Sequence, residues 1–425
     1  MLAPHFKTST PRTGLILTGG GARAAYQVGV LAALAQLRRD AGATEGNPFP
    51  IIAGTSAGAI NAATLAGQAD DFDGAVDGLM HIWQNIHAEQ VYAADAFGVI
   101  RSGARWMTMM SLGWALARWR RTQPKSLLDN APLGDLLRRW VRLERLDTML
   151  ADGHLHALAI SGSSYTSGQH VTFFQSLATV EPWLRSQRLA VRTQLSVDHL
   201  LASSAIPFIF PARSLDLLGQ AEWFGDGSMR QSAPISPAIH LGAERVLVIG
   251  AGRMHEPAGA PRAALVQGHP SMAQIAGHAL SNIFLDALAV DVERLQRINN
   301  TLKLLSPEAL AATALRPIDV LVIAPSRRLD DLAAEHQGSL PPPIRALLRG
   351  AGAKSSANNK AASGSALTSY LLFEPSFTNA LINLGMADTL ARRAEVQHFF
   401  GWPTQAPSVD PAALRRRRAG FAELA

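Results

Sequence analysis

A serine between two glycines is the residue of this chain best placed to act as a nucleophile. Ser56 is the centre of Gly-Thr-Ser-Ala-Gly at 54–58, after the apolar run 49–53 and before the helix-like run 59–65. A strand that turns sharply into a helix needs small residues around the turn, and it exposes the residue at its apex. A hydroxyl there faces a helix N-terminus, where backbone N–H groups stabilise negative charge. The pattern predicts a nucleophilic serine, with a purely structural turn as the alternative.

A run of three glycines is the second feature that could do chemistry. Gly19, Gly20 and Gly21 follow the buried-strand pattern 14–18 and precede Arg23 and a helical pattern from Ala25. Successive glycines leave several backbone N–H groups free to point at one spot, with no side chain in the way. The loop is therefore predicted to bind an anion, which is either a dinucleotide pyrophosphate or the oxyanion of an acyl-transfer intermediate.

The dinucleotide interpretation has a specific requirement that the chain does not meet. The glycine run satisfies G-x-G-x-x-G/A, but that motif also needs an acidic residue at the end of the second strand to hold the ribose. Here the second strand ends at Gly54 without a carboxylate, and Asp40 and Glu45 precede it. The oxyanion interpretation explains both glycine-rich turns, because each ends a neighbouring strand. We favour it and expect no cofactor.

An aspartate between two glycines is the third feature. Asp226 follows a short apolar stretch and lies between Gly225 and Gly227. Alone, this pattern is typical of an Asx-turn, in which the carboxylate bonds its own backbone. Considered with the two earlier motifs, it favours a functional carboxylate.

Taken in order, the three motifs resemble those of the patatin-like phospholipases, whose patterns are G-G-G-x-R/K, G-x-S-x-G and D-G-A/G. The resemblance covers roughly the first 325 residues. The chain departs from the family at Ala24, where glycine is common, and at Ser228, where alanine or glycine usually closes the third motif. Both replacements are small, so we expect the chemistry to be retained.

The resemblance implies a Ser-Asp dyad without a catalytic histidine and without a metal. Ser56 would attack an ester carbonyl while Asp226 takes and returns the proton. The oxyanion hole would come from the glycine loop at 19–21 and from Ala57. Arg23 would hold the loop, meet a lipid phosphate or form an ordinary salt bridge. The implied substrates are phospholipids or lysophospholipids.

Two other functions stay open at this stage. A Ser-His-Asp triad on an α/β-hydrolase fold also uses a G-x-S-x-G turn, with the histidine late in the chain. His240, His255, His269 and His278 are the candidates for that histidine. The other function is a lipid-binding scaffold that has kept the fold but not the reaction, although every proposed catalytic group is present.

Composition fits a soluble enzyme rather than a membrane-spanning protein. The chain has 425 residues, of which 48% are hydrophobic and 17% charged, and it has no cysteine. Disulfides and thiolate metal sites are therefore excluded. We see no signal-peptide pattern and no run of about 18 to 20 apolar residues. A cytoplasmic location is expected.

Two basic segments suggest contact with an anionic surface. Residues 97–119 combine tryptophans, among them Trp106 and Trp114, with methionines and arginines, which suits peripheral contact with a membrane or a cap over the active site. The arginine run 415–418 is typical of a solvated tail. No nucleic-acid-binding pattern accompanies it, so no nucleic-acid partner is expected. The oligomeric state is not predicted.

The order of elements predicts an α/β fold. Strands alternating with helices indicate a three-layer α/β/α arrangement, with a mostly parallel central sheet and sites at its carboxyl edge. Besides the first two, strands are expected at 155–161, 170–175, 246–250 and 318–324. We expect a catalytic domain at 1–330 with a helical, Trp-rich insertion at about 70–150. A low-complexity linker at 350–366 and a helical C-terminal extension with a basic tail at 367–425 would follow.

Overall fold

The computed structural model describes residues 11–93, 126–177, 179–253, 271–282, 287–350 and 365–403. Several features of the sequence lie outside these residues: the Trp-rich segment 97–119, most of the linker 350–366, the arginine run 415–418, His255 and His269. Within the described part of the chain, no helix combines the length and the hydropathy that crossing a bilayer would need.

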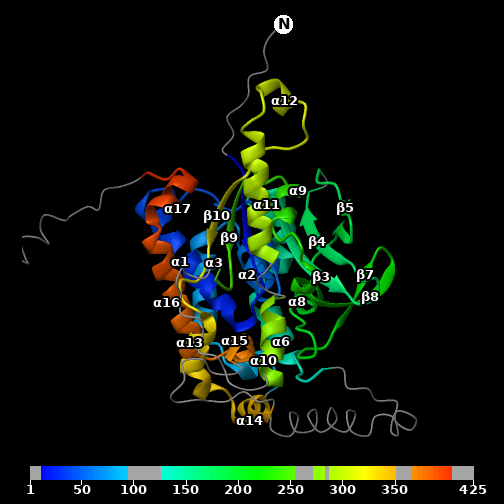
Figure 1. The fold of residues 1–425 in the computed structure, drawn as a ribbon, viewed down its shortest axis with the longest axis vertical. Coiled ribbons are helices and arrows are strands. Elements are labelled where there is room, and N and C mark those ends of the chain that lie inside the picture. Colours follow the sequence, from blue (N-terminus) through cyan, green and yellow to red (C-terminus); the bar gives the residue numbers. More distant parts are fainter. Residues whose placement is uncertain are drawn as a thin grey trace, which may run out of the picture.

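A mostly parallel sheet forms the centre of the molecule (Figure 1). The described residues contribute ten strands: β1 (Thr13–Leu17), β2 (Ile51–Thr55), β3 (Ala157–Ser164), β4 (His170–Ser176), β5 (Leu184–Arg185), β6 (Arg188–Arg192), β7 (Arg213–Leu217), β8 (Gln220–Asp226), β9 (Arg245–Ile249) and β10 (Asp319–Ile323). Their order is β10-β9-β1-β2-β3-β4-β6-β5, and β8 pairs with β3 and β7. The run from β10 to β3 is parallel, whereas β4, β5, β7 and β8 add antiparallel pairs at one side.

The central strands are buried on both faces, as their uninterrupted apolar sequences predict. Every residue of β1 and β2 is buried. Alternate side chains enter different cores: Leu15 and Leu17 pack into the larger one, and Ile16 packs into the smaller one on the opposite face. Helices cover both faces, which confirms the predicted three-layer arrangement.

The helices divide between the two faces of the sheet. Residues of α1 (Ala25–Asp40), α2 (Ala57–Ala66), α3 (Phe72–Gln84) and α16 (Pro375–Ala391) belong to the larger core, and residues of α9 (Ser236–His240) and α11 (Ala287–Leu302) belong to the smaller one. The remaining α-helices are α4 (Ala88–Val91), α6 (Ala131–Trp140), α7 (Leu146–Ala151), α8 (Val197–Ser203), α10 (Met272–Ser281), α12 (Pro307–Ala311), α13 (Leu329–His336), α14 (Pro342–Gly350), α15 (Ser365–Leu371) and α17 (Arg393–Phe400). Short 3-10 helices are η1 (Gly21–Ala24), η2 (Leu143–Arg145), η3 (Gly227–Arg230) and η5 (Gln337–Ser339).

The helical C-terminal residues pack directly onto the first helix of the chain. Helix α16 lies beside α1 (Figure 1), and the two backbones touch through a pair of glycines. A Cβ added to Gly29 would lie 2.0 Å from the carbonyl oxygen of Ile382, and one added to Gly385 would lie 2.2 Å from that of Tyr26. Any side chain at either glycine would therefore force the helices apart. Helices α1, α2 and α3 consequently share one core with the C-terminal helix α16.

Candidate active site

Ser56 occupies a strained turn between β2 and α2. Its φ of 56° and ψ of −131° are rarely adopted by a residue with a side chain. The strain is maintained because α2 packs closely against the end of β1: a Cβ on Gly58 would lie 2.3 Å from the carbonyl oxygen of Leu17. From the other side, the Ser56 N–H donates to the Ser203 hydroxyl at 2.9 Å. The turn is thus held from both sides with the serine at its apex.

The glycine loop lies next to this turn because β1 and β2 are adjacent and parallel. Their carboxyl ends therefore meet at one edge of the sheet. Gly21 has a left-handed φ of 54°, and a Cβ there would lie 2.3 Å from the carbonyl oxygen of Tyr370. Gly21, Ser56 and Ala57 line the same pocket. As the first residue of α2, Ala57 has an N–H without an intrahelical partner, which suits it to bind an anion.

Strand register explains how Asp226 reaches Ser56 from 170 residues away. Strand β2 pairs with β3 up to Thr55, which lies opposite Ser161. The next residue of β3, Gly162, lies opposite Asp226, the last residue of the antiparallel strand β8. Because β4 occupies the other edge of β3, β2 and β8 approach each other end to end along the same edge. Their final residues are therefore brought together.

The carboxyl group of Asp226 is fully buried, with 0% of the residue exposed. One oxygen, Oδ1, accepts the Ser228 N–H at 2.9 Å, so the Asx-turn contact is present. The other oxygen, Oδ2, has no hydrogen-bond partner among the described residues. Burial raises the pKa of this carboxyl to about 6, and the hydroxyl of Ser56 and the Ser228 groups offset part of the rise. No hydrogen bond of standard geometry joins Ser56 to Asp226. The serine hydroxyl is nevertheless close enough to lower the pKa of the carboxyl group.

Arg23 is buried and contacts residues of α13 and α15. The residue is 2% exposed, and its guanidinium forms an ion pair with Asp330 of α13. Its Nε donates to the Ser369 hydroxyl at 2.8 Å, and the guanidinium lies 4.0 Å from the ring centroid of Tyr370. Of the three roles considered for Arg23, the contacts match holding the loop through a salt bridge.

An apolar pocket extends from Ser56 between α2, α3 and α6. Ala57, Ile60 and Thr64 line it from α2, so the pocket follows one face of that helix away from Ser56. The other lining residues are mostly large and apolar, and none is charged: Leu79, Ile82, Trp83, Ile86, Val91, Leu133, Leu136, Leu137, Trp140, Val141, Ile206, Phe210 and Phe373, with Ser204 and Gly21. Such a pocket suits a hydrocarbon chain.

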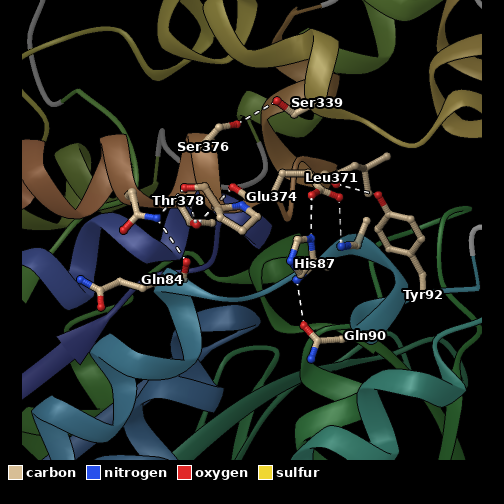
Figure 2. A network of polar contacts seen from close by, with 12 residues as sticks. Gln84, His87, Gln90, Tyr92, Ser339, Leu371, Glu374, Ser376 and Thr378 are labelled. Carbon is tan, nitrogen blue, oxygen red and sulfur yellow. Dashed lines mark hydrogen bonds and ion pairs between the residues drawn. The ribbon is translucent and has the colours of Figure 1, made fainter.

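The C-terminal segment that supplies Phe373 is fixed by polar contacts (Figure 2). The Tyr92 hydroxyl donates to the carbonyl oxygen of Leu371 at 2.7 Å. Glu374 accepts from the Ala88 N–H at 3.3 Å, and its other oxygen lies 3.0 Å from His87 Nδ1. Figure 2 shows these contacts converging on the loop between α15 and α16. They hold Phe373 in the pocket wall.

The described histidines do not form a triad with Ser56. None of them makes a hydrogen bond with Ser56 or Asp226. His240 accepts or donates at Ser236 and stacks on Trp183, with 4.8 Å between ring centroids. His278 is exposed on α10.

Four residues belong to the site although no pattern in the sequence predicted that they would. Ser203 binds the turn of Ser56, Asp330 and Tyr370 contact Arg23 and Phe373 lines the pocket. The small residues at 202–205 indicate close packing, but a pattern of this kind does not identify its partner.

A family comparison agrees with this arrangement. The family model described as patatin-like phospholipase matches residues 15–239, which is more than half of the chain and includes all three motifs. The chain belongs to the patatin-like phospholipase family. Membership implies lipid acyl hydrolase activity. None of the curated proteins compared with the chain matches it.

Solved structures of distant proteins also resemble the chain. VipD from Legionella pneumophila is 12% identical over 88% of this chain and 67% of its own, with a TM-score of 0.30. Human GIVD cytosolic phospholipase A2 was solved with methyl gamma-linolenyl fluorophosphonate and terbium chloride, and it is 14% identical over 94% of this chain, with a TM-score of 0.41. The matched region spans 60% of that human protein.

Proposed function

We propose that this protein hydrolyses carboxylic esters of phospholipids or lysophospholipids through a Ser56–Asp226 dyad. The observation that carries the proposal is the meeting of three features at one sheet edge. Ser56 lies on a strained turn, Asp226 has a buried carboxylate oxygen without a partner among the described residues, and an apolar pocket whose described lining carries no charge begins at the serine. Each feature alone has a structural explanation, but together they match the needs of acyl transfer to a serine.

The first half of the reaction forms an acyl-enzyme. Asp226 Oδ2 accepts the hydroxyl proton of Ser56 as Oγ attacks the ester carbonyl carbon. The carbonyl oxygen becomes negative and accepts hydrogen bonds from the backbone N–H groups of the 19–21 loop and Ala57. The tetrahedral intermediate then expels the alcohol, which takes the proton back from Asp226. Water completes the cycle by the same steps, releasing the fatty acid and restoring the Ser56 hydroxyl.

A carboxylate is an effective base here only because its pKa is raised. Burial brings the pKa of Asp226 to about 6, so the group is ionised at neutral pH yet holds a proton more readily than an exposed aspartate. Burial also excludes water from the base. These two effects support a dyad without histidine.

Covalent labelling tests the nucleophile directly. A fluorophosphonate probe should form a bond from phosphorus to Ser56 Oγ with loss of fluoride, and peptide mass spectrometry should find the adduct at Ser56. Ser56→Ala should abolish both labelling and ester hydrolysis. Ser339→Ala, at a serine that contacts Ser376 and does not line the pocket, should label normally.

Hydrolysis of a lipid panel, followed by product mass spectrometry, tests the reaction class. Release of a free fatty acid that is lost in Ser56→Ala supports the proposal. Lipid binding without turnover in the wild type would assign the protein as a scaffold. Labelling that persists in Ser56→Ala would identify a different nucleophile.

A further inference from the structure

A cationic side chain near the active site would stabilise the phosphate of a phospholipid substrate, and Arg23 is not available for this role. Arg23 is buried and its charge is neutralised by Asp330. A second pocket, separate from the apolar one, lies beside the aspartate loop and is lined by two other arginines, Arg188 and Arg230. None of the described residues that line this pocket carries a carboxylate.

The wall of this second pocket contacts Asp226 and the residue that precedes Ser56. Ser228, which lines the pocket, donates its N–H to Asp226 Oδ1 at 2.9 Å. Gln231, also in the wall, donates from Nε2 to the hydroxyl of Thr55 at 2.8 Å, and Thr55 directly precedes Ser56. A group bound here would therefore lie beside the turn that carries Asp226 and near the carboxyl end of β2.

Strand register brings Arg188 to the same edge of the sheet. The first residue of β6, Arg188, lies opposite His170 of β4, and His170 lies opposite Ser163 of β3. Ser163 follows Gly162, which pairs with Asp226. Arg230 arrives by a different route, as the last residue of η3 immediately after the aspartate loop. Two distant segments thus place a guanidinium in one pocket.

Neither guanidinium group has an anionic partner in the part of the chain that the structure describes. Among the described residues, no ion pair or hydrogen bond joins Arg188 or Arg230 to a carboxylate. The charge of Arg188 acts on the pKa of Asp291. Burial raises this pKa, and the Ile235 N–H, Arg294 and Arg188 offset part of the rise. The carboxylate of Asp291, however, is occupied by the Ile235 N–H at 3.0 Å and by Arg294. The positive charge of Arg188 also adds to the effect of burial in lowering the pKa of His170 to about 4.

An unpartnered hydroxyl completes the set of donors. Ser228 is 5% exposed, and its Oγ makes no hydrogen bond of standard geometry with a described residue, although it lies near enough to Asp226 to help lower the pKa of that carboxyl. A buried hydroxyl without a partner is costly, so it indicates a site that a ligand acceptor can satisfy. Guanidinium groups bind phosphate oxygens through two parallel hydrogen bonds, and a serine hydroxyl can add a third donor.

We propose that Arg188, Arg230 and Ser228 form a subsite for the phosphate of the substrate head group. This inference rests on the proposed lipid hydrolase function and adds a preference to it: esters that carry a phosphate are favoured over neutral esters with the same acyl chain. The acyl chain occupies the apolar pocket, the ester lies at Ser56, and the phosphate lies beyond Asp226.

A matched pair of substrates isolates the phosphate. Lysophosphatidic acid and monoacylglycerol with the same short acyl chain differ only in that group, and both are assayed as monomers. The double variant R188Q/R230Q should lose about 10- to 100-fold in kcat/KM on lysophosphatidic acid, as expected for losing charge-assisted hydrogen bonds. On monoacylglycerol it should change less than about threefold, since no phosphate contact is made.

Arg192→Gln is the matched control. Arg192 is exposed and lies on the same strand as Arg188, four residues further from the sheet edge. Because it does not line the pocket, this variant tests the loss of a positive charge outside the proposed subsite. This variant should leave unchanged the ratio of kcat/KM on lysophosphatidic acid to kcat/KM on monoacylglycerol. Equal losses on both substrates in R188Q/R230Q, or no loss on either, would overturn the subsite. Absence of hydrolysis of both esters by the wild type would instead overturn the proposed function.

Competition separates a head-group subsite from a site for free phosphate. Glycerol 3-phosphate should inhibit wild-type hydrolysis of monoacylglycerol more strongly than inorganic phosphate does, and R188Q/R230Q should lose that inhibition. Inhibition by inorganic phosphate alone, without discrimination between the two lipids, would contradict a role in substrate binding.

Discussion

Arg23 forms a buried ion pair with Asp330, a residue 307 positions further along the chain. The pair connects the glycine loop to α13, and Ser369 and Tyr370 add contacts from α15. Both helices lie beyond the region matched by the family model, which ends at residue 239. The glycine loop is therefore positioned by C-terminal residues as well as by its own strand.

Asp330→Asn should disturb this positioning. The substitution leaves the Arg23 charge buried without its carboxylate, and breaking a buried ion pair costs about 3 kcal/mol or more. We expect a lower free energy of unfolding and a fall in kcat that exceeds any rise in KM, because the loop donates mainly to the oxyanion of the transition state. Asp331→Asn, at an exposed neighbour on α13, should change neither. A rise in KM alone would contradict a role in the oxyanion loop.

Gly21→Ala tests the contact between the loop and α15. A Cβ at Gly21 would meet the Tyr370 carbonyl oxygen at 2.3 Å, and the φ of 54° is itself unfavourable for alanine. We expect turnover to fall by at least about 100-fold, as for loss of an oxyanion donor. Gly42→Ala is the control, because Gly42 has a φ of 67° but no atom within 4 Å of its added Cβ. It should cost about 1 kcal/mol in stability and leave turnover intact. Similar effects at both glycines would show that backbone strain alone is responsible.

Local patterns were sufficient to predict the core of the site. The apolar runs before Gly19 and Ser56 predicted two buried strands, and the glycines around each turn predicted their sharp exits, because these features depend on neighbouring residues. The strands expected at 155–161, 170–175, 246–250 and 318–324 correspond to β3, β4, β9 and β10.

Contacts between distant segments could not be predicted in the same way. The sequence around Asp330 and Tyr370 reads as ordinary helix, and nothing in it identifies Arg23 as a partner. Gly29 and Gly385 would each weaken an isolated helix. Only the contact between α1 and α16 explains them, because any side chain there would clash with the backbone of the other helix. The end-to-end approach of β2 and β8 likewise depends on register along β3, which no local pattern specifies.

The activity should depend on the ionisation of Asp226. Because the base must be ionised to accept the serine proton, kcat/KM should rise as the pH increases through about 6 and then level off.

Asp226→Asn should lower activity roughly 10²- to 10⁴-fold by removing the base. His240→Ala and His278→Ala should retain both the activity and the profile. A histidine variant that folds but does not turn over would replace the dyad with a triad.

The same carboxyl should make the folded protein less stable as the pH rises. Its pKa is about 6 when folded and near 3.8 when exposed, so between these values the folded state binds a proton that the unfolded state has released. The free energy of unfolding therefore falls with increasing pH over this range, by up to about 3 kcal/mol.

Asp226→Asn removes that dependence. Denaturant unfolding at pH 4 and pH 7 should show the variant gaining up to about 3 kcal/mol relative to the wild type between the two values. Asp331→Asn should give a difference that does not change with pH. A constant difference for Asp226→Asn would mean that burial does not raise the pKa of this group.

The apolar pocket should set the acyl-chain preference. Thr64 lies seven residues beyond Ala57 on α2, about 10 Å along the helix axis, and both line the pocket. Thr64→Phe should block the far part of the pocket, so esters of long acyl chains should lose activity while those of short chains keep it. Each methylene that can no longer be buried costs about 0.8 kcal/mol, roughly fourfold in kcat/KM.

Ile60→Phe, one turn nearer to Ser56, should move the cut-off to shorter chains. Thr64→Val, which keeps the size of the side chain, should leave the preference unchanged. If all chain lengths lose activity equally in Thr64→Phe, the pocket is part of the packed core and the acyl chain lies elsewhere.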